Sequence, residues 1–107
     1  MEKLADLVEV QEHISLQPLC LLFIKTADCG VCDDVYVKTE ELLTKYPQVS
    51  AVVVSADESP AVAGEFLVFT APTILLFAEG REVHRQARFV VFGKLEEAVQ
   101  GWVEALS

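Results

Sequence analysis

The sequence predicts an α/β protein in which helices cover both faces of a mixed central sheet, giving a three-layer sandwich. Short apolar runs typical of buried strands recur along the chain, and segments with the apolar period of a helix lie between them. The last two predicted strands are separated only by a tight turn. Strands joined through a helix should be parallel with a right-handed connection, whereas the last pair should form an antiparallel hairpin.

Length and composition favour one domain over residues 1–107, with no repeat, linker or break in composition. Apolar residues make up 52 % of the chain and charged residues 23 %, which excludes a disordered protein because the apolar side chains suffice for a core.

The first half of the chain is predicted to alternate helix and strand. Residues 3–15 have the pattern of an amphipathic helix, and residues 19–25 form a continuous apolar run typical of a buried strand. A longer helix is predicted over residues 30–46, where Tyr46-Pro47 ends it, and residues 51–55 form a second buried strand.

A third helix and a third strand follow. Ser59 is expected to be the N-cap and Pro60 the first residue of a short helix that ends near Val68. Residues 73–78 are again a continuous apolar run, so we expect a strand there.

The C-terminal part is predicted to contain a hairpin and a helix. Glu79-Gly80 is a two-residue turn into a fourth strand over residues 82–88. Gly93 precedes the last helix, whose apolar stripe consists of Leu95, Val99, Trp102 and Leu106. The predicted order is therefore α-β-α-β-α-β-β-α.

The charge of the chain limits its partners. There are 17 acidic and 8 basic residues, a formal net charge of −9, which disfavours binding to nucleic acid or to an anionic membrane. The residues from Met1 to Asp6 alternate charges where a signal peptide would be apolar, and the early apolar run from Leu19 to Ile24 falls short of the roughly 20 residues of a membrane helix. We therefore expect a cytoplasmic protein. As separate expectations, it should be a monomer and need no cofactor.

Cys29-Gly30-Val31-Cys32 is the strongest chemical signal in the chain. It lies where a strand is predicted to end and a helix to begin, so both side chains should lie on one side of the first turn, close enough for a disulfide. Free N–H groups and the helix dipole favour a thiolate at Cys29, which would attack a partner disulfide. Cys32, one turn deeper, would then resolve the mixed disulfide.

Other interpretations of the cysteines remain open. The pair could be chance core residues, because free cysteine is often buried. A zinc site needs four ligands, and the only further candidates, Cys20, His13 and His84, show no second paired spacing. A metal or iron–sulfur cluster shared between two chains stays conceivable. Cys20 is expected to be a core residue, and both histidines to lie on the surface.

These motifs together resemble the thioredoxin family. The resemblance rests on the C-G-x-C at residues 29–32, on Ser59-Pro60, on Thr70-Ala71-Pro72-Thr73 and on Glu79-Gly80, and it covers nearly the whole chain. It implies a thioredoxin fold with four to five strands. It also implies a thiol–disulfide oxidoreductase that reduces cytosolic protein substrates and receives electrons from a disulfide reductase.

The resemblance also assigns roles to individual residues. Cys29 and Cys32 would be the catalytic pair, and Pro72 would follow a cis peptide bond beside them. Thr70, Ala71 and Pro72 would then align an extended substrate segment, with Ala71 offering its backbone.

Four residues depart from the family pattern. Asp28 replaces a tryptophan and Val31 an often-found proline, while Phe23 and Val53 stand where the family has a buried acid and its lysine partner. The loss of the acid and the lysine together favours an alternative, a binding or adaptor module of the same fold with little redox activity. Binding by such a module would survive the change of both cysteines to serine.

Charges near the motif also differ from the expected pattern. Asp28, Asp33 and Asp34 flank the cysteines and should raise the pKa of Cys29 above that of typical family members, although acidic residues in a first helical turn also stabilise the helix. Arg88 lies where the family has a small residue in the substrate groove. Arg81, Arg85 and Arg88 are expected to protect a sheet edge, and the segment 89–92 is too apolar for a plain connection.

Overall fold

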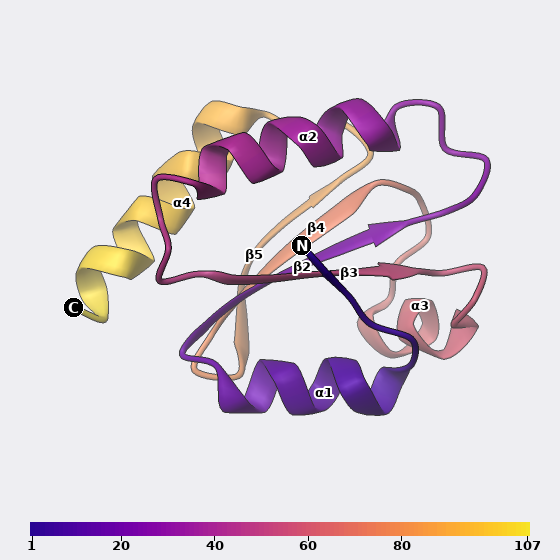
Figure 1. Ribbon diagram of the computed structural model, residues 1–107, viewed down its shortest axis with the longest axis horizontal. Helices are drawn as coiled ribbons and strands as arrows, with labels where there is room; N and C mark the ends of the chain where they lie inside the picture. Colours follow the sequence, from indigo (N-terminus) through magenta and orange to yellow (C-terminus); the bar gives the residue numbers. More distant parts are fainter.

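The computed structural model describes residues 1–107 and confirms the three-layer arrangement (Figure 1). One face of a central sheet is covered by α1 (Leu7–Leu16) and α3 (Pro60–Phe66), and the other by α2 (Cys32–Leu43) and α4 (Phe92–Ala105). None of the four helices combines the length and the apolar character that a membrane-spanning segment needs.

The sheet has five strands in the order β1-β3-β2-β4-β5. Their bounds are Glu2–Lys3 for β1, Leu19–Lys25 for β2, Ser50–Ser55 for β3, Thr73–Ala78 for β4 and Arg81–Ala87 for β5. Strands β2 and β3, which α2 connects, are parallel, and β4 is antiparallel to both β2 and β5. The predicted parallel pair and the predicted hairpin are therefore both confirmed.

The N-terminal segment differs from the prediction. Glu2 and Lys3 form the edge strand β1, which pairs with β3, so the first helix begins at Leu7 and not at residue 3. Asp6 is its N-cap and accepts a hydrogen bond from the Glu9 N–H at 2.9 Å. A strand of two residues is too short to show any periodicity, which is why the sequence pattern does not reveal it.

Two other helices are shorter than predicted. Helix α2 begins at Cys32 and ends at Leu43, inside the predicted range of 30–46. Helix α3 ends at Phe66 because Leu67 takes a left-handed conformation, with φ of 53°. Ser59 occupies the N-cap position of α3, but its side chain makes no capping hydrogen bond.

The hairpin contains the expected turn. Glu79 and Gly80 both have positive φ, 50° and 81°, which is the backbone of the two-residue turns that match the twist of paired strands. Strand β5 begins one residue earlier than predicted, at Arg81, and the register shifts between Leu76 and Phe77. Helix α4 begins at Phe92, so Gly93 lies inside it.

The core consists of two apolar clusters, one on each face of the sheet. Alternate residues of β2 belong to different clusters, as the two-residue period of a strand requires. Cys20 and Ile24 pack with α1 and α3, whereas Leu21 and Phe23 pack with α2 and α4. The predicted stripe of the last helix belongs to this second cluster, in which Leu95 and Val99 are its fully buried members.

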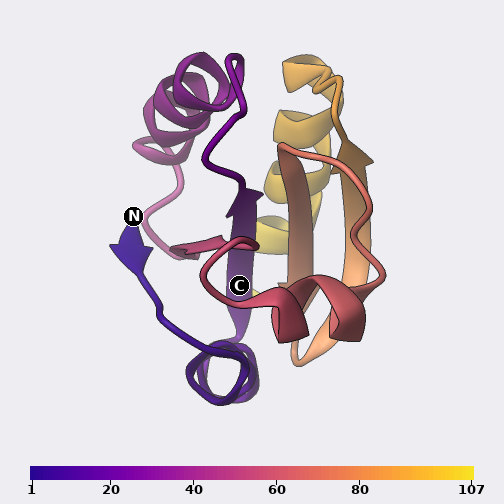
Figure 2. The same ribbon diagram turned by 90° about the vertical axis from the view of Figure 1, so that its right-hand side faces the viewer.

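The cysteine motif and Pro72 lie at the same end of the strands, which is here called the functional edge of the sheet. The carboxyl ends of β2, β3 and β5 and the amino end of β4 all lie there, because β4 alone among these four strands runs the opposite way. Figure 2 shows β2 and β5 running in the same direction on either side of β4. The cysteine motif follows β2 and Pro72 precedes β4, so the topology brings the two to the same edge.

Candidate active site

Cys29 and Cys32 form a disulfide in the turn between β2 and α2. Their Cα atoms are 5.3 Å apart, within the usual range for a bridged pair. Cys32 is the first residue of α2, and its N–H donates to the Cys29 carbonyl at 3.3 Å. Cys29 therefore lies just before the helix, at the junction of strand and helix that the sequence indicates.

The two sulfur-bearing residues differ in exposure. Cys29 is half-buried, whereas Cys32 is only 2 % exposed. A partner can therefore approach Cys29 more readily than Cys32. Free N–H groups at the start of α2 lie next to Cys29, and such groups favour a thiolate.

The acidic residues of the motif point to helix stabilisation. Asp33 and Asp34 lie exposed in the first turn of α2, where negative charge interacts favourably with the helix dipole. The N-cap residue, Val31, provides no side-chain hydrogen bond, so these two aspartates are the polar side chains available to this helix end. Asp28 is exposed in the preceding turn.

The second part of the site is the segment of residues 70–72 that leads into β4, here called the ridge. The Ala71–Pro72 peptide bond is cis, the isomer that the resemblance implies, and Pro72 is buried. Thr73 pairs with Ile24 of β2 on one side and with Ala87 of β5 on the other, which places the ridge between the ends of these strands. The Thr73 hydroxyl donates to the Thr70 carbonyl at 2.7 Å and fixes the turn.

A small cavity lies beside the ridge. Its volume is about 310 Å³, and most of its lining is apolar. The lining residues come from the ends of β2 and β3 and from the segment before β4: Ile24, Thr26, Ala56, Val68, Phe69, Thr70 and Ala71. Two of the three residues predicted to bind substrate, Thr70 and Ala71, therefore border a space that an apolar side chain could enter.

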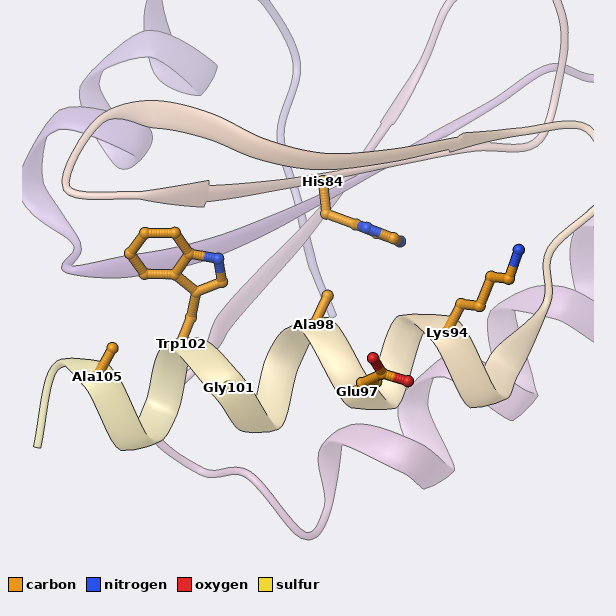
Figure 3. Close-up of a pocket in the computed structure, with 7 residues that line it drawn as sticks. All are labelled: His84, Lys94, Glu97, Ala98, Gly101, Trp102 and Ala105. Atoms are coloured by element: carbon orange, nitrogen blue, oxygen red, sulfur yellow. The ribbon is translucent and has the colours of Figure 1, made fainter.

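A larger cavity lies elsewhere, between β5 and α4. It measures about 650 Å³ and is open to solvent, and Figure 3 shows His84 and Trp102 on its two sides. It contains no cysteine, so size alone does not mark the site of disulfide chemistry here.

The position beneath the motif is entirely apolar. Phe23 and Val53 are buried and face each other in the register of β2 and β3. The Phe23 ring packs edge-on against Tyr36 of α2, with ring centroids 5.4 Å apart. Neither of the two positions carries an ionisable group that could exchange a proton with the cysteines.

The third cysteine is separate from this pair. Cys20 is fully buried near the start of β2, opposite Ser50 and Phe77, and burial raises the pKa of its thiol to about 12. Both histidines are half-buried: His13 hydrogen-bonds Ser50, and His84 hydrogen-bonds Gln86. No three residues among the histidines, cysteines and acidic side chains are grouped so that they could hold a metal ion.

Two residues near the site, Phe69 and Asp57, belong to no motif in the sequence. Phe69, next to Thr70, is 89 % exposed, an unusual state for phenylalanine. Asp57 accepts a hydrogen bond from the Ala27 N–H and so holds the turn that leads to Cys29. Only the pairing of β2 with β3 brings Asp57 to this turn, so a local motif could not reveal it.

Comparison with known proteins agrees with this geometry. The family model described as Thioredoxin matches residues 8–101. The thioredoxin-like protein YdfQ of Bacillus subtilis is 35 % identical over 100 residues, which cover 94 % of this chain and 89 % of that protein.

Solved structures show the same fold. A thioredoxin-like protein from Bacillus cereus is 35 % identical and superposes with a TM-score of 0.70 over 87 % of this chain and 98 % of that one. Fasciola hepatica thioredoxin is 25 % identical and superposes with a TM-score of 0.85 over 94 % of this chain and 98 % of that one. The protein has the thioredoxin fold, its Cys29–Cys32 pair fits the C-x-x-C motif of thiol–disulfide oxidoreductases, and the chain belongs to the thioredoxin family.

Proposed function

We propose that this protein reduces disulfides in other proteins in the cytoplasm, with Cys29 as the nucleophile and Cys32 as the resolving thiol. The observation that carries the proposal is the bridged pair itself, in which the more exposed sulfur-bearing residue precedes the helix and the buried one begins it. A disulfide reductase would supply the electrons, and the protein would act as a monomer.

The reaction proceeds by two exchanges. The Cys29 thiolate attacks one sulfur of the substrate disulfide, forming a mixed disulfide and releasing the first substrate thiolate. The Cys32 sulfur, as its thiolate, then attacks Cys29 and releases the second substrate thiolate. Two electrons pass from the protein dithiol to the substrate, the Cys29–Cys32 disulfide forms, and the reductase returns it to the dithiol.

The ridge at residues 70–72 would align the substrate. The backbone N–H and C=O of Ala71 have no hydrogen-bond partner within the chain, so both are free for an extended segment. Pro72 has no N–H to offer and fixes the backbone beside Ala71. Thr70 is held by the Thr73 hydroxyl and contributes to the wall of the small cavity.

The equilibrium potential of the Cys29–Cys32 pair tests the proposal. Protein poised in dithiol/disulfide buffers is alkylated, and the two redox states are counted by mass. A two-electron transition near or below the potential of the cytosolic thiol pool supports a reductase, and Cys32→Ser should then trap substrates as mixed disulfides. A much higher potential would indicate an oxidant or isomerase, and the absence of a reversible disulfide would exclude the redox function. Cys20→Ala is the matched control because it removes a thiol outside the pair.

A binding module with little redox activity is the second candidate. The apolar pair Phe23 and Val53 favours it, because the family's buried acid and lysine are both absent. The Cys29→Ser/Cys32→Ser double variant separates the two functions. Partner binding that is unchanged in this variant would support the module, whereas loss of partner capture would support the reductase.

A further inference from the structure

Arg88 occupies an unusual position next to the ridge. It follows the last residue of β5, and its N–H donates to the Pro72 carbonyl at 2.7 Å. Its φ is 65°, a left-handed conformation that residues other than glycine rarely take. The hydrogen bond to Pro72 holds the backbone there, so the conformation belongs to the site and not to a free loop.

The side chain of Arg88 has no structural partner that would explain it. It is exposed, and no carboxylate lies within ion-pair distance of its guanidinium. Its one aromatic contact is the ring of Phe89, 5.8 Å from the guanidinium carbon, and this ring is itself 81 % exposed. By contrast Arg85, three residues earlier, is paired with Glu82. Protection of the sheet edge therefore does not account for Arg88.

The order of the strands fixes where Arg88 lies relative to the cysteines. Along the functional edge of the sheet, the turn carrying Cys29 follows β2, the ridge at Pro72 precedes β4, and Arg88 follows β5. The cysteine side carries the carboxylate of Asp28, and the β5 side carries the guanidinium. A segment lying across the ridge thus meets opposite charges at its two ends.

We propose that Arg88 and Phe89 select the substrate: an extended protein segment that carries an acidic residue and a large apolar residue close to its reactive disulfide. The inference rests on the proposed reductase function and deepens it. The carboxylate would pair with Arg88, and the apolar side chain would cover the exposed ring of Phe89.

Charge decides between this occupant and others. The chain has a net charge of −9, so an acidic partner is repelled by most of its surface and is favoured only where an unpaired cation stands. A nucleic acid or an anionic membrane would instead present its charge to the whole edge, including Asp28 and Asp33. The partner that fits is a segment with a short acidic stretch at the Arg88 end and no charge where it passes Asp28.

The test uses peptides that contain one cysteine as a mixed disulfide with 5-thio-2-nitrobenzoate. The Cys29 thiolate attacks the peptide sulfur and the coloured thiolate leaves, so one exchange step is measured without turnover. The protein is the Cys32→Ser variant, and the peptides carry Glu, Gln or Lys at one of the two positions on either side of their cysteine. A parallel set carries Phe or Ala at the same positions.

We expect the peptide with Glu to react about three- to ten-fold faster than the peptide with Lys in at least one position, as exposed charge pairs allow. The preference should shrink at high salt, reverse in Arg88→Glu and vanish in Arg88→Gly, which suits the positive φ. Phe89→Ala should remove the preference for Phe. Arg81→Glu is the matched control, since Arg81 is an exposed arginine at the far end of β5, opposite Ala78.

Two results would overturn the inference. One is that the ratio of the exchange rates of the Glu and Lys peptides is the same in Cys32→Ser and in both Arg88 variants made from it, at every peptide position. The other is that Cys29 attacks none of the peptides. Turnover of the same peptides by protein with both cysteines and a dithiol reports on the proposed function separately. If turnover is absent while the charge preference persists in the single step, the selectivity stands and the reductase proposal fails.

Discussion

Replacing Arg85 with alanine should break the hydrogen bonds that hold the end of α3 against β5. The segment that leads from α3 to Pro72 should then become less firmly attached to the sheet. The Arg85 guanidinium donates to the Phe66 carbonyl at 2.6 Å and to the Leu67 carbonyl at 3.1 Å, at the end of α3. Glu82 holds the guanidinium in place through hydrogen bonds of 2.9 and 2.8 Å. One side chain therefore connects the last turn of α3 to the sheet, just before the residues proposed to align substrate.

The size of the effect follows from these contacts. Each hydrogen bond to a carbonyl contributes about 0.5–1.5 kcal/mol net, and an exposed ion pair adds about 0.2–1 kcal/mol. The side chains of Arg85 and Glu82 are 31 % and 37 % exposed, so the lower halves of these ranges apply. We expect Arg85→Ala to lower the free energy of unfolding by about 2 kcal/mol, which corresponds to roughly 10 °C in the thermal midpoint of a domain this small.

Urea unfolding and amide exchange together measure this change. The urea midpoint should fall by about 1 M, and exchange should accelerate at the Leu67 and Val68 amides, which bond to the last turn of α3. Arg85→Lys should recover less than half of the loss, because a lysine cannot form the paired bonds of a guanidinium. Arg81→Ala is the control. A free energy of unfolding of Arg85→Ala that lies within about 0.5 kcal/mol of the parent value would show that these contacts do not stabilise the fold.

The same pair makes a prediction about pH. The hydrogen bonds from Arg85 lower the pKa of Glu82 below its usual value. A carboxyl group with a lowered pKa in the folded state stabilises the protein above its unfolded pKa and loses this contribution as the pH falls through the folded pKa. The stability difference between the parent and Arg85→Ala should therefore narrow under acid conditions, and an unchanged difference would count against the ion pair.

Three further predictions concern other parts of the chain. Because burial raises the pKa of Cys20 to about 12, iodoacetamide should leave Cys20 unmodified in the native reduced protein and modify it after unfolding; a label on Cys20 in the native state would contradict this. Leu67→Gly should raise the free energy of unfolding by about 0.5–1 kcal/mol, since it removes left-handed strain at the end of α3; a lower thermal midpoint would argue otherwise. Glu96→Gln should lower the thermal midpoint at neutral pH, because Glu96 pairs with Lys45 at 2.6 Å and accepts from Tyr46 at 2.7 Å. Both contacts lower the pKa of Glu96, so this difference should disappear in acid, and its persistence there would exclude an electrostatic cause.

The parts of the fold that could be predicted from sequence are those with strong local patterns. Strand β4 has the predicted bounds because a continuous apolar run lies between Pro72 and the Glu79-Gly80 turn. The N-terminal strand could not be predicted, since Glu2 and Lys3 are polar and become a strand only by pairing with β3. The end of α3 depends on the backbone of Leu67, a residue type that rarely takes positive φ.

In the candidate site, too, the local motif could be predicted from the sequence and the long-range contacts could not. The cysteine pair is a local motif, and the structure places it where the sequence indicates, with Pro72 at the same edge of the sheet. The contacts of Asp57 and Arg85 join residues 30 and 19 positions apart in the chain, so no sequence spacing predicts them. The family resemblance places Arg88 near the expected substrate groove, but its lack of an ion-pair partner is visible only in three dimensions.

The apolar pair beneath the cysteines shows why two departures from the family pattern occur together. Phe23 and Val53 occupy one register position of β2 and β3 and are both buried, so a charge at either position would lack a partner and cost several kcal/mol. Loss of the acid therefore removes the reason for the lysine, and two apolar side chains fill the space, with Tyr36 packed against Phe23. In the proposed mechanism, a protein built in this way can still attack a disulfide with Cys29, because that step uses the more exposed residue of the pair. In the same mechanism, release of the substrate requires Cys32 to lose its proton without help from either position, so we expect this step to be the slower one and the mixed disulfide to live longer than in relatives that keep the charged pair.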